Sequence, residues 1–164
     1  MTELLVSKQT ETDWPQLWRV LEPAFRAGES YPLPCDVSEE EAKRYWIKTD
    51  GYNAVARDET GAIVGVYYLR PDQGGPGAHI CNAGYVITEA SRGRGLATAL
   101  CLQSQEQARA MGFRGMKFNL VVSTNIAAVK AWKKAGMEII GTVPGAFSHP
   151  AQGFVDAYIM FRAL

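Results

Sequence analysis

The segment Tyr85-Val-Ile-Thr-Glu-Ala-Ser-Arg-Gly-Arg-Gly-Leu-Ala-Thr98 predicts a strand that passes through a glycine-rich turn into a helix. The first amides of a helix have no partner within it, and with the positive end of the helix dipole they form an anion site. Gly93 and Gly95 let phosphate oxygens approach the main chain, and Arg92 and Arg94 add donors. We interpret the turn as a pyrophosphate site. The alternative is that the glycines only shape a tight surface turn.

Two familiar phosphate-binding patterns do not fit this turn. A dinucleotide-binding fingerprint needs a glycine or alanine where Thr98 stands, and an acidic residue at the end of a strand about 20 residues further on. A P-loop needs a lysine directly after its last glycine, where this chain has Leu96. The turn therefore predicts a pyrophosphate ligand outside these two classes.

Hydrophobic periodicity on both sides of the turn predicts one domain, residues 1–164, with helices packed on a mixed α/β sheet. The apolar run 116–122 is typical of a strand in the middle of a sheet. The expected strands are 3–7, 52–57, 62–70, 80–88, 116–122, 137–143 and 154–162, and the expected helices are 14–27, 38–46, 95–111 and 125–135.

Composition argues against several classes of protein. Lys and Arg together number 17, as do Asp and Glu, so the net charge of zero argues against a nucleic-acid partner. No apolar run approaches the about 20 residues that cross a bilayer, and residues 1–14 lack the pattern of a secretion signal, so we expect no membrane partner. Cys35, Cys81 and Cys101 cannot all pair and show no C-x-x-C spacing. We therefore expect a cytoplasmic protein without a metal site.

Two motifs resemble those of one enzyme family. Arg92-x-x-Gly95-x-Ala97 is similar to the R/Q-x-x-G-x-G/A loop of the GNAT N-acetyltransferase superfamily. Further along, Asn125-x-x-Ala128 followed by Trp132, Lys134, Gly136 and Met137 is similar to that family's segment N-x-x-A-x-x-x-Y-x-K-x-G-F. The resemblance implies the GNAT fold, a mixed central sheet of about seven strands flanked by about four helices, with acetyl-CoA as co-substrate.

The resemblance also implies how acetyl-CoA is bound. Its pyrophosphate is expected on the amides of residues 92–98, and its pantetheine arm along residues 85–87, where two parallel strands diverge. Asn125 is expected beside that arm. The cofactor-binding residues implied in this way are Tyr85, Val86, Ile87, Arg92, Gly93, Arg94, Gly95, Leu96, Ala97, Thr98, Asn125, Ala128 and Trp132.

Trp132 departs from the family pattern. Many members have a tyrosine here, close to the thiol, and an indole cannot donate a phenolic proton. The usual general acid is therefore absent or elsewhere. A thiol has a pKa of about 8.5, so thiolate can leave without strong acid assistance.

A narrower resemblance concerns the acceptor. The strings His79-Ile-Cys-Asn-Ala-Gly-Tyr-Val86, Phe118-Asn-Leu-Val121 and Ser123-Thr-Asn125 are similar to fungal proline-analogue N-acetyltransferases, which acetylate azetidine-2-carboxylate and related cyclic imino acids. The likeness implies that Asn82 and Asn119 bind the acceptor and its carboxylate, and that Asn119 and Asn125 serve catalysis.

The residues themselves leave these asparagine roles open. Asparagines at strand ends and helix starts often satisfy the local main chain, so Asn125 can be a helix cap, a catalytic residue or both. Asn119 stands inside an apolar strand, where an unpaired amide is costly, and this favours a role in the site. The general base is not identified by the sequence.

The function predicted is direct transfer of acetyl from acetyl-CoA to the amine of a small molecule, either an amino acid or a cyclic imino acid. A neutral amide can bind a carboxylate or a polarised carbonyl at any protonation state, which suits such a site. Two alternatives stay open: a non-catalytic acyl-CoA-binding module, which Trp132 favours, and a protein N-terminal acetyltransferase. A homodimer is expected because dimers are frequent in the resembled family.

Overall fold

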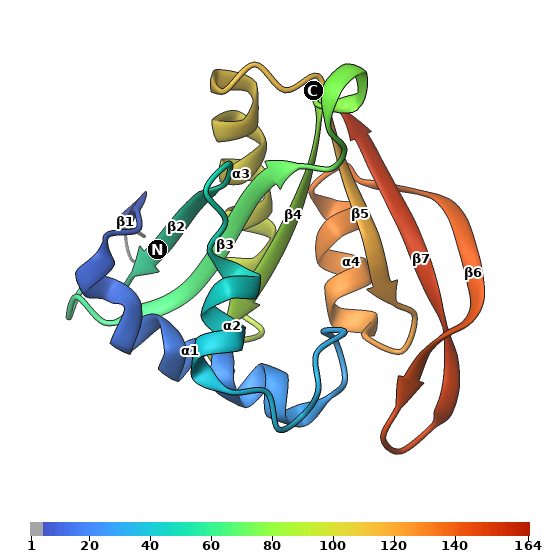
Figure 1. Ribbon diagram of the computed structural model, residues 1–164, viewed down its shortest axis with the longest axis horizontal. Coiled ribbons are helices and arrows are strands. Elements are labelled where there is room, and N and C mark those ends of the chain that lie inside the picture. The colour runs from blue at the N-terminus through green and yellow to red at the C-terminus, as the bar shows by residue number, and fades with distance from the viewer. Residues whose placement is uncertain (1–4) are drawn as a thin grey trace.

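The computed structural model describes residues 5–164, which form one sheet with helices on both faces (Figure 1). Its strands are β1 (Leu5–Lys8), β2 (Tyr52–Arg57), β3 (Ile63–Pro71), β4 (Ile80–Ile87), β5 (Gly115–Val122), β6 (Glu138–His149) and β7 (Gly153–Ala163). Its α-helices are α1 (Trp14–Ala27), α2 (Glu39–Trp46), α3 (Leu96–Ala110) and α4 (Ile126–Lys134).

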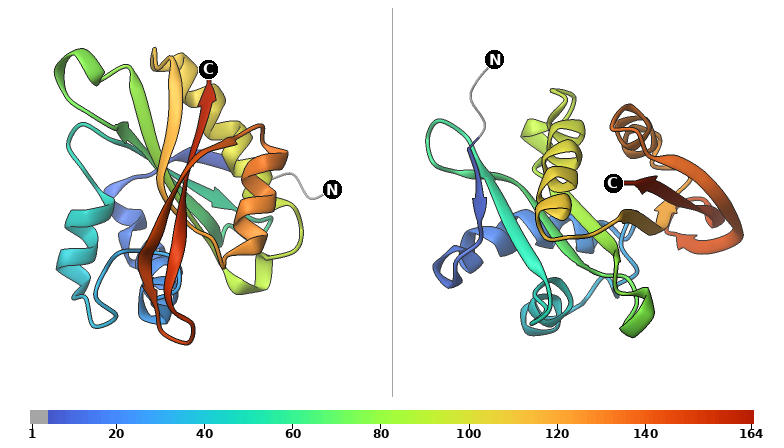
Figure 2. Two further views of the ribbon diagram at one scale, coloured as in Figure 1. Left: turned by 90° about the vertical axis from the view of Figure 1, so that its right-hand side faces the viewer. Right: turned by 90° about the horizontal axis from the view of Figure 1, so that it is seen from above.

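The strands lie in the order β1-β2-β3-β4-β5-β7-β6. Neighbours are antiparallel except β4 and β5, which are parallel. Seen from above, α1 and α2 lie on one side of the sheet and α3 and α4 on the other (Figure 2). The mixed sheet with four helices that the resemblance implied is therefore confirmed.

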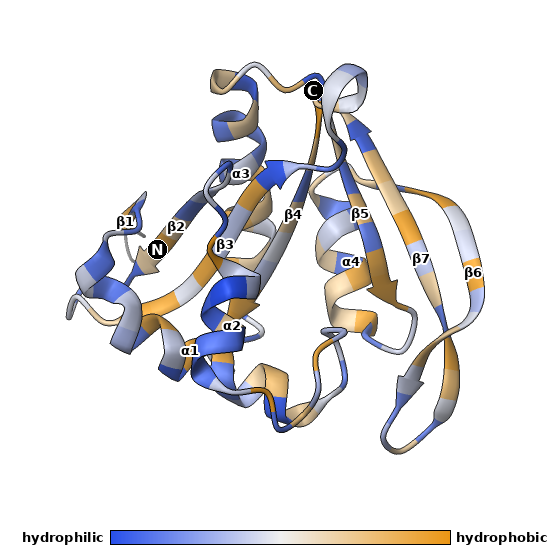
Figure 3. Ribbon diagram, viewed as in Figure 1, coloured by the Kyte–Doolittle hydropathy of each residue, from blue (hydrophilic) through white to orange (hydrophobic). Residues whose placement is uncertain are grey.

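Local signals in the sequence explain where the first two helices begin and end. Gly28 ends α1 in the left-handed conformation (φ 65°), which glycine adopts without strain. Ser38 and Glu41 cap the start of α2 reciprocally, as the capping-box spacing predicts. The strongly hydrophilic residues visible on α2 in Figure 3 belong to its run of charged side chains.

Each face of the sheet has its own hydrophobic core. One core packs α1 and α2 on side chains such as Val55, Tyr68 and Val86. The other packs α3 and α4 on the opposite face, against side chains such as Tyr67 and Met116. Alternate residues of a strand therefore point to different cores, which fixes the face that each functional side chain occupies.

Most predicted strands differ from the observed ones by one residue at an end, and the first strand and β6 differ by more. The strand expected at 3–7 is β1, Leu5–Lys8, and residues 3 and 4 lie outside the described residues. The strand expected at 137–143 continues to His149, since β6 pairs with β7 again beyond the irregularity between Val143 and Phe147. Pro144 and Gly145 lie at that irregularity, where bulges tolerate both residue types. None of the described helices is long and apolar enough to cross a membrane.

Candidate active site

The two parallel strands separate soon after they meet. β4 and β5 pair over three positions only, the last of which joins Asn82 to Lys117, although both strands continue. In Figure 1 the two ribbons diverge from that point toward the turn that precedes α3. Main-chain groups beyond Asn82 and Lys117 therefore lack a neighbouring strand on this side.

The register of β3 identifies which groups face the gap. The Thr88 N–H donates to the Val64 carbonyl at 3.0 Å, so these two residues form a hydrogen-bonded pair of the antiparallel ladder. Such pairs alternate, so the N–H and C=O groups of Tyr85 and Ile87 point away from β3, toward β5. Val86 lies between them, bonded to β3 and with its side chain buried beneath α1. Of the three predicted strand residues, Tyr85 and Ile87 thus offer main-chain groups to the gap.

A tyrosine from the loop between α1 and α2 reaches into this gap. The Tyr31 hydroxyl donates to the Tyr85 carbonyl at 2.8 Å. Burial raises the pKa of Tyr31 well above its ordinary value, so the hydroxyl keeps its proton at neutral pH. The carbonyl has a second lone pair and can still accept another hydrogen bond.

The glycine-rich turn has the geometry of an anion site. Gly93 and Gly95 adopt left-handed conformations with φ of 74° and 79°, and a Cβ at either position would meet open space. The first main-chain bond of α3 runs from the Ala99 N–H to the Gly95 carbonyl, which leaves the amides of residues 96–98 without main-chain partners. Arg92 and Arg94 are exposed beside them. The predicted turn into a helix is confirmed, with α3 beginning at Leu96.

Asn125 caps α4 through its side chain. The Ala128 N–H donates to Asn125 Oδ1 at 3.3 Å, and the Val129 N–H donates to the Asn125 carbonyl at 3.1 Å. The capping alternative left open by the sequence is therefore realised. The Asn125 Nδ2 group has no partner among the described residues and is free to donate to a ligand.

Trp132 fills the space between the diverging strands from the α3 and α4 side. Its ring packs on Tyr85 of β4, with 4.7 Å between centroids, and edge-on against Phe118 of β5 at 5.5 Å. The Tyr85 hydroxyl in turn forms a hydrogen bond with Ser104 Oγ of α3 at 2.7 Å. The indole is thus part of an aromatic cluster (Tyr85, Phe118 and Trp132) that forms one side of the gap.

Polar side chains gather where the strands separate, on the face covered by α1 and α2. Asn82 Nδ2 donates to the Lys117 carbonyl at 3.0 Å, and Asn82 Oδ1 accepts from the Tyr68 hydroxyl at 3.3 Å. Lys117 Nζ lies 2.8 Å from Asp72 Oδ2, and Asn119 Nδ2 donates to Asp72 Oδ1 at 2.6 Å. We call Asp72, Asn82, Lys117 and Asn119 the polar cluster. It brings together two of the predicted asparagines, whereas Asn125 lies apart at the start of α4.

Asn119 is exposed, although its position in an apolar strand predicted burial. The pairing of β5 with β7 is irregular between Phe118 and Val121, so Asn119 lies at the bulge rather than inside the ladder. Since the Asn119 amide nitrogen faces a carboxylate, Asn119 Oδ1 is left to accept a hydrogen bond from a ligand.

The sequence analysis missed Asp72 and Lys117. Burial raises the pKa of the Asp72 carboxyl, but hydrogen bonds from Lys117 and Asn119 and the charge of Lys117 outweigh burial, and the pKa lies below its usual value. A lysine inside the apolar run 116–122 was the available signal. Nothing in the sequence indicates that Asp72 reaches across β4 to that lysine.

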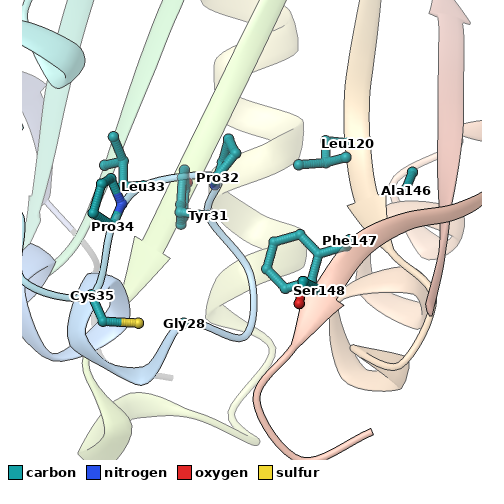
Figure 4. Close-up of a pocket in the computed structure, with 10 residues that line it drawn as sticks. All are labelled: Gly28, Tyr31, Pro32, Leu33, Pro34, Cys35, Leu120, Ala146, Phe147 and Ser148. Carbon is teal, nitrogen blue, oxygen red and sulfur yellow. The ribbon is translucent and has the colours of Figure 1, made fainter. Parts of the chain in front are cut away.

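A pocket of about 340 Å³ opens beside β5, the strand that carries Lys117 and Asn119 of the polar cluster (Figure 4). The loop after α1 forms one wall with Tyr31 and Leu33, and Leu120 of β5 and Phe147 of β6 face it across the opening. Apolar walls of this kind suit the hydrocarbon part of a small ligand.

The buried thiols are poor candidates for nucleophiles. Burial raises the pKa of Cys81 to about 12 and that of Cys101 to about 11, so both stay protonated near pH 7. Within residues 5–164 no group of three His, Cys, Asp or Glu side chains is arranged to hold a metal ion.

The comparisons with known proteins agree with this geometry. Residues 14–137 match the model of the acetyltransferase (GNAT) family. N-acetyltransferase aca1 from Schizosaccharomyces pombe is 27% identical over 148 residues, which are 80% of this chain and 71% of that protein.

Solved structures share the whole arrangement. A GCN5-related N-acetyltransferase from Kribbella flavida is 37% identical and superposes with a TM-score of 0.92 over 98% of both chains. A GNAT-superfamily phosphinothricin acetyltransferase from Sinorhizobium meliloti, solved in complex with AcCoA, has the same fold, with a TM-score of 0.87 at 21% identity over 100% of this chain and 89% of its own. The chain therefore belongs to the GNAT family of N-acetyltransferases.

Proposed function

We propose that this chain transfers acetyl from acetyl-CoA directly to the amine of a small molecule, either an amino acid or a cyclic imino acid. One observation carries the proposal: β4 and β5 separate after Asn82 and Lys117, between an open helix start and the polar cluster. A thioester in this gap has a binding surface for its diphosphate on one side and room for an amine on the other.

The donor is held mainly by the main chain in this proposal. The amides of residues 92–98 bind the pyrophosphate, with Arg92 and Arg94 as added donors. The pantetheine arm extends the sheet along the free groups of Tyr85 and Ile87, against the aromatic cluster. Asn125 Nδ2 lies at the start of α4, where it can bind the arm's carbonyl groups.

The reaction is a single displacement. The ammonium form of the acceptor loses one proton to water, the neutral nitrogen attacks the thioester carbon, and the resulting oxyanion accepts hydrogen bonds from main-chain N–H groups of β4. The C–S bond then breaks, and the CoA thiolate that leaves takes up the second proton, which the nitrogen gives up as it becomes an amide. Asn119 Oδ1 can accept from the amine, and Asn82 orients the acceptor at the point where the strands separate. The raised pKa values of Cys81 and Cys101 make these two buried thiols poor carriers of an acetyl group.

The acceptor class is supported by the asparagines and by the likeness to proline-analogue acetyltransferases. The acceptor amine lies on the face that bears the polar cluster, and the apolar pocket beside Tyr31 and Phe147 accommodates its hydrocarbon part. Balanced net charge favours a small acceptor over a highly charged macromolecule. We also propose a cytoplasmic homodimer, which light scattering on the purified chain tests.

Trp132 supports a second candidate, an acyl-CoA-binding module without turnover. The indole lacks the phenolic proton of the tyrosine usual at this position, and it is packed into the aromatic cluster. The two functions share the donor site and differ only in chemistry.

Calorimetry with acetyl-CoA and a coupled assay of free thiol separate the functions. The enzyme predicts heat of binding and release of CoA thiol that depends on an added amine, over a panel of amino and imino acids that includes azetidine-2-carboxylate. Binding without thiol release over the whole panel would support the module. Absence of binding heat would contradict both.

A further inference from the structure

Two cationic side chains, Lys117 and Arg70, lie close to the point where β4 and β5 separate, and only one of them is paired with a carboxylate. Lys117 is neutralised by Asp72, with 2.8 Å between Nζ and Oδ2. Arg70, on β3, has no carboxylate within ion-pair distance among residues 5–164. It is nonetheless half-buried, and a partly buried cation without an anion is costly.

Two tyrosines fix the Arg70 guanidinium in place. Its carbon lies 4.0 Å from the centre of the Tyr68 ring and 5.3 Å from that of Tyr45. Its Nη1 donates to the Tyr45 carbonyl at 2.9 Å. Guanidinium has five N–H donors, so most of them stay free in a group that is already oriented. Little side-chain entropy is then lost when a ligand binds it.

Arg70 is next to the point where β4 and β5 separate. It is the cross-strand partner of Asn82, so both side chains point to the same face, about 5 Å apart at their Cβ atoms. The Tyr68 ring that stacks on Arg70 also bonds Asn82 through its hydroxyl. On its other side, Tyr45 packs edge-on against Tyr31, which lines the apolar pocket. Tyrosine contacts thus connect Arg70 both to Asn82, where the strands separate, and to the wall of the pocket.

We propose that Arg70 binds the carboxylate of the acceptor, which makes a free carboxylate part of the substrate class. The proposal rests on the proposed function and deepens it. A planar guanidinium can bind a carboxylate through two parallel N–H···O bonds, which neutral asparagine amides cannot match in charge. The carboxylate of the substrate then serves as the counter-ion that residues 5–164 do not provide for Arg70.

This assignment separates acceptor classes. Amino and imino acids offer a carboxylate near the reacting amine, whereas the terminal residue of a peptide has that carboxyl in an amide bond. Simple amines and amino-acid amides leave Arg70 unpaired, so they are poor substrates.

The test compares each acid with its own amide, starting with azetidine-2-carboxylate and azetidine-2-carboxamide. We expect Arg70→Met to lower the acid-to-amide ratio of kcat/KM by about thirtyfold or more, since hydrogen bonds to charged groups are lost. Comparing the ratio between variants cancels the different basicity of the two amines. Arg70→Lys keeps the charge without the planar guanidinium, so its acid-to-amide ratio should lie between those of the wild-type chain and Arg70→Met.

Arg44→Met is the matched control, because Arg44 is an exposed arginine of α2 that pairs only with Glu40. It should leave the ratio unchanged. If Arg70 served only to hold Tyr45 and Tyr68, Arg70→Met would lower both rates together, and an unchanged ratio would overturn the proposal. Acetylation of the amide as readily as the acid by the wild-type chain would also overturn it, with the proposed function intact. No transfer to any amine would contradict the proposed function itself.

Discussion

Asp72 and Lys117 form an ion pair across β4, with Oδ2 and Nζ 2.8 Å apart although their strands are not neighbours. The same carboxylate holds Asn119 at 2.6 Å. One side chain that follows β3 therefore sets the positions of two side chains on β5, at the point where β5 leaves β4. The Asp72 side chain is 4% exposed and the Lys117 side chain 30%, so solvent screens the pair only in part.

Asp72→Asn should destabilise the chain by about 2 kcal/mol at pH 7, because the half-buried Lys117 loses its counter-charge. The pKa of Asp72 is lower in the folded chain than in the unfolded chain. Its contribution is therefore complete above the unfolded value of about 3.9 and is lost as pH falls through the lower folded value. Urea unfolding of both proteins at pH 7 and in steps below pH 4 measures the difference. Asp36→Asn, at an exposed carboxylate, is the control, and a difference that persists unchanged to the lowest pH would contradict this account.

Gly95→Ala should weaken acetyl-CoA binding about tenfold or more, because the new Cβ projects into the space proposed for the pyrophosphate. The left-handed backbone also costs alanine about 1 kcal/mol of stability. Gly61→Ala provides the matched control, since Gly61 is also left-handed with open space around a Cβ, in the turn between β2 and β3. Scanning calorimetry should show equal losses of stability in the two variants, and titration calorimetry should show a loss of affinity for acetyl-CoA in Gly95→Ala only. Equal affinities would place the pyrophosphate elsewhere.

Asn125 has two proposed duties that a pair of substitutions can separate. Asn125→Ala should destabilise the chain by about 1 kcal/mol, because the cap on the Ala128 amide is lost. Asn125→Asp should restore the stability, since aspartate caps equally well, but kcat/KM for acetyl-CoA should stay about tenfold low because the carboxylate has no N–H to donate. Thermal unfolding and initial rates measure the two effects. If Asn125→Asp has the wild-type kcat/KM for acetyl-CoA, Asn125 acts only as a helix cap.

Trp132→Tyr tests whether a phenolic proton is missed at this position. The smaller ring leaves part of the space between Tyr85 and Phe118 unfilled, so we expect a stability loss of about 1–2 kcal/mol. Because thiolate is a tolerable leaving group, kcat should change by no more than about threefold. If the natural chain binds acetyl-CoA without turnover and the Trp132→Tyr variant gains turnover, the natural protein is a binding module instead.

Much of the fold is predictable from local pattern. The turn at Gly93 and Gly95, the capping box at Ser38 and the apolar run 116–122 each depend on neighbours in the sequence, and each is found as predicted. The full length of β6 is not predictable in this way, because the strand resumes after a bulge that is defined only by pairing with β7.

The site is less predictable, because its contacts join distant segments. Asn119 is a clear case: hydrophobicity predicts burial, whereas the irregular pairing with β7 leaves it exposed and bonded to Asp72. Arg70 and Asp72 stand at the end of β3, and their importance follows only from the register that brings them beside β4 and β5. The asparagines were found through a family likeness, which reports residue type but not hydrogen-bond partners.

The short ladder between β4 and β5 makes this seam the weakest main-chain connection in the sheet. Three residue pairs join the half built from β1 to β4 to the half built from β5, β7 and β6. A ligand lying along the free edge of β4 therefore acts as a substitute strand, and cohesion of the two halves becomes linked to occupancy of the gap. Amide hydrogens of Tyr85 and Ile87 should accordingly exchange with solvent rapidly in the free protein and slowly in its complex with the donor.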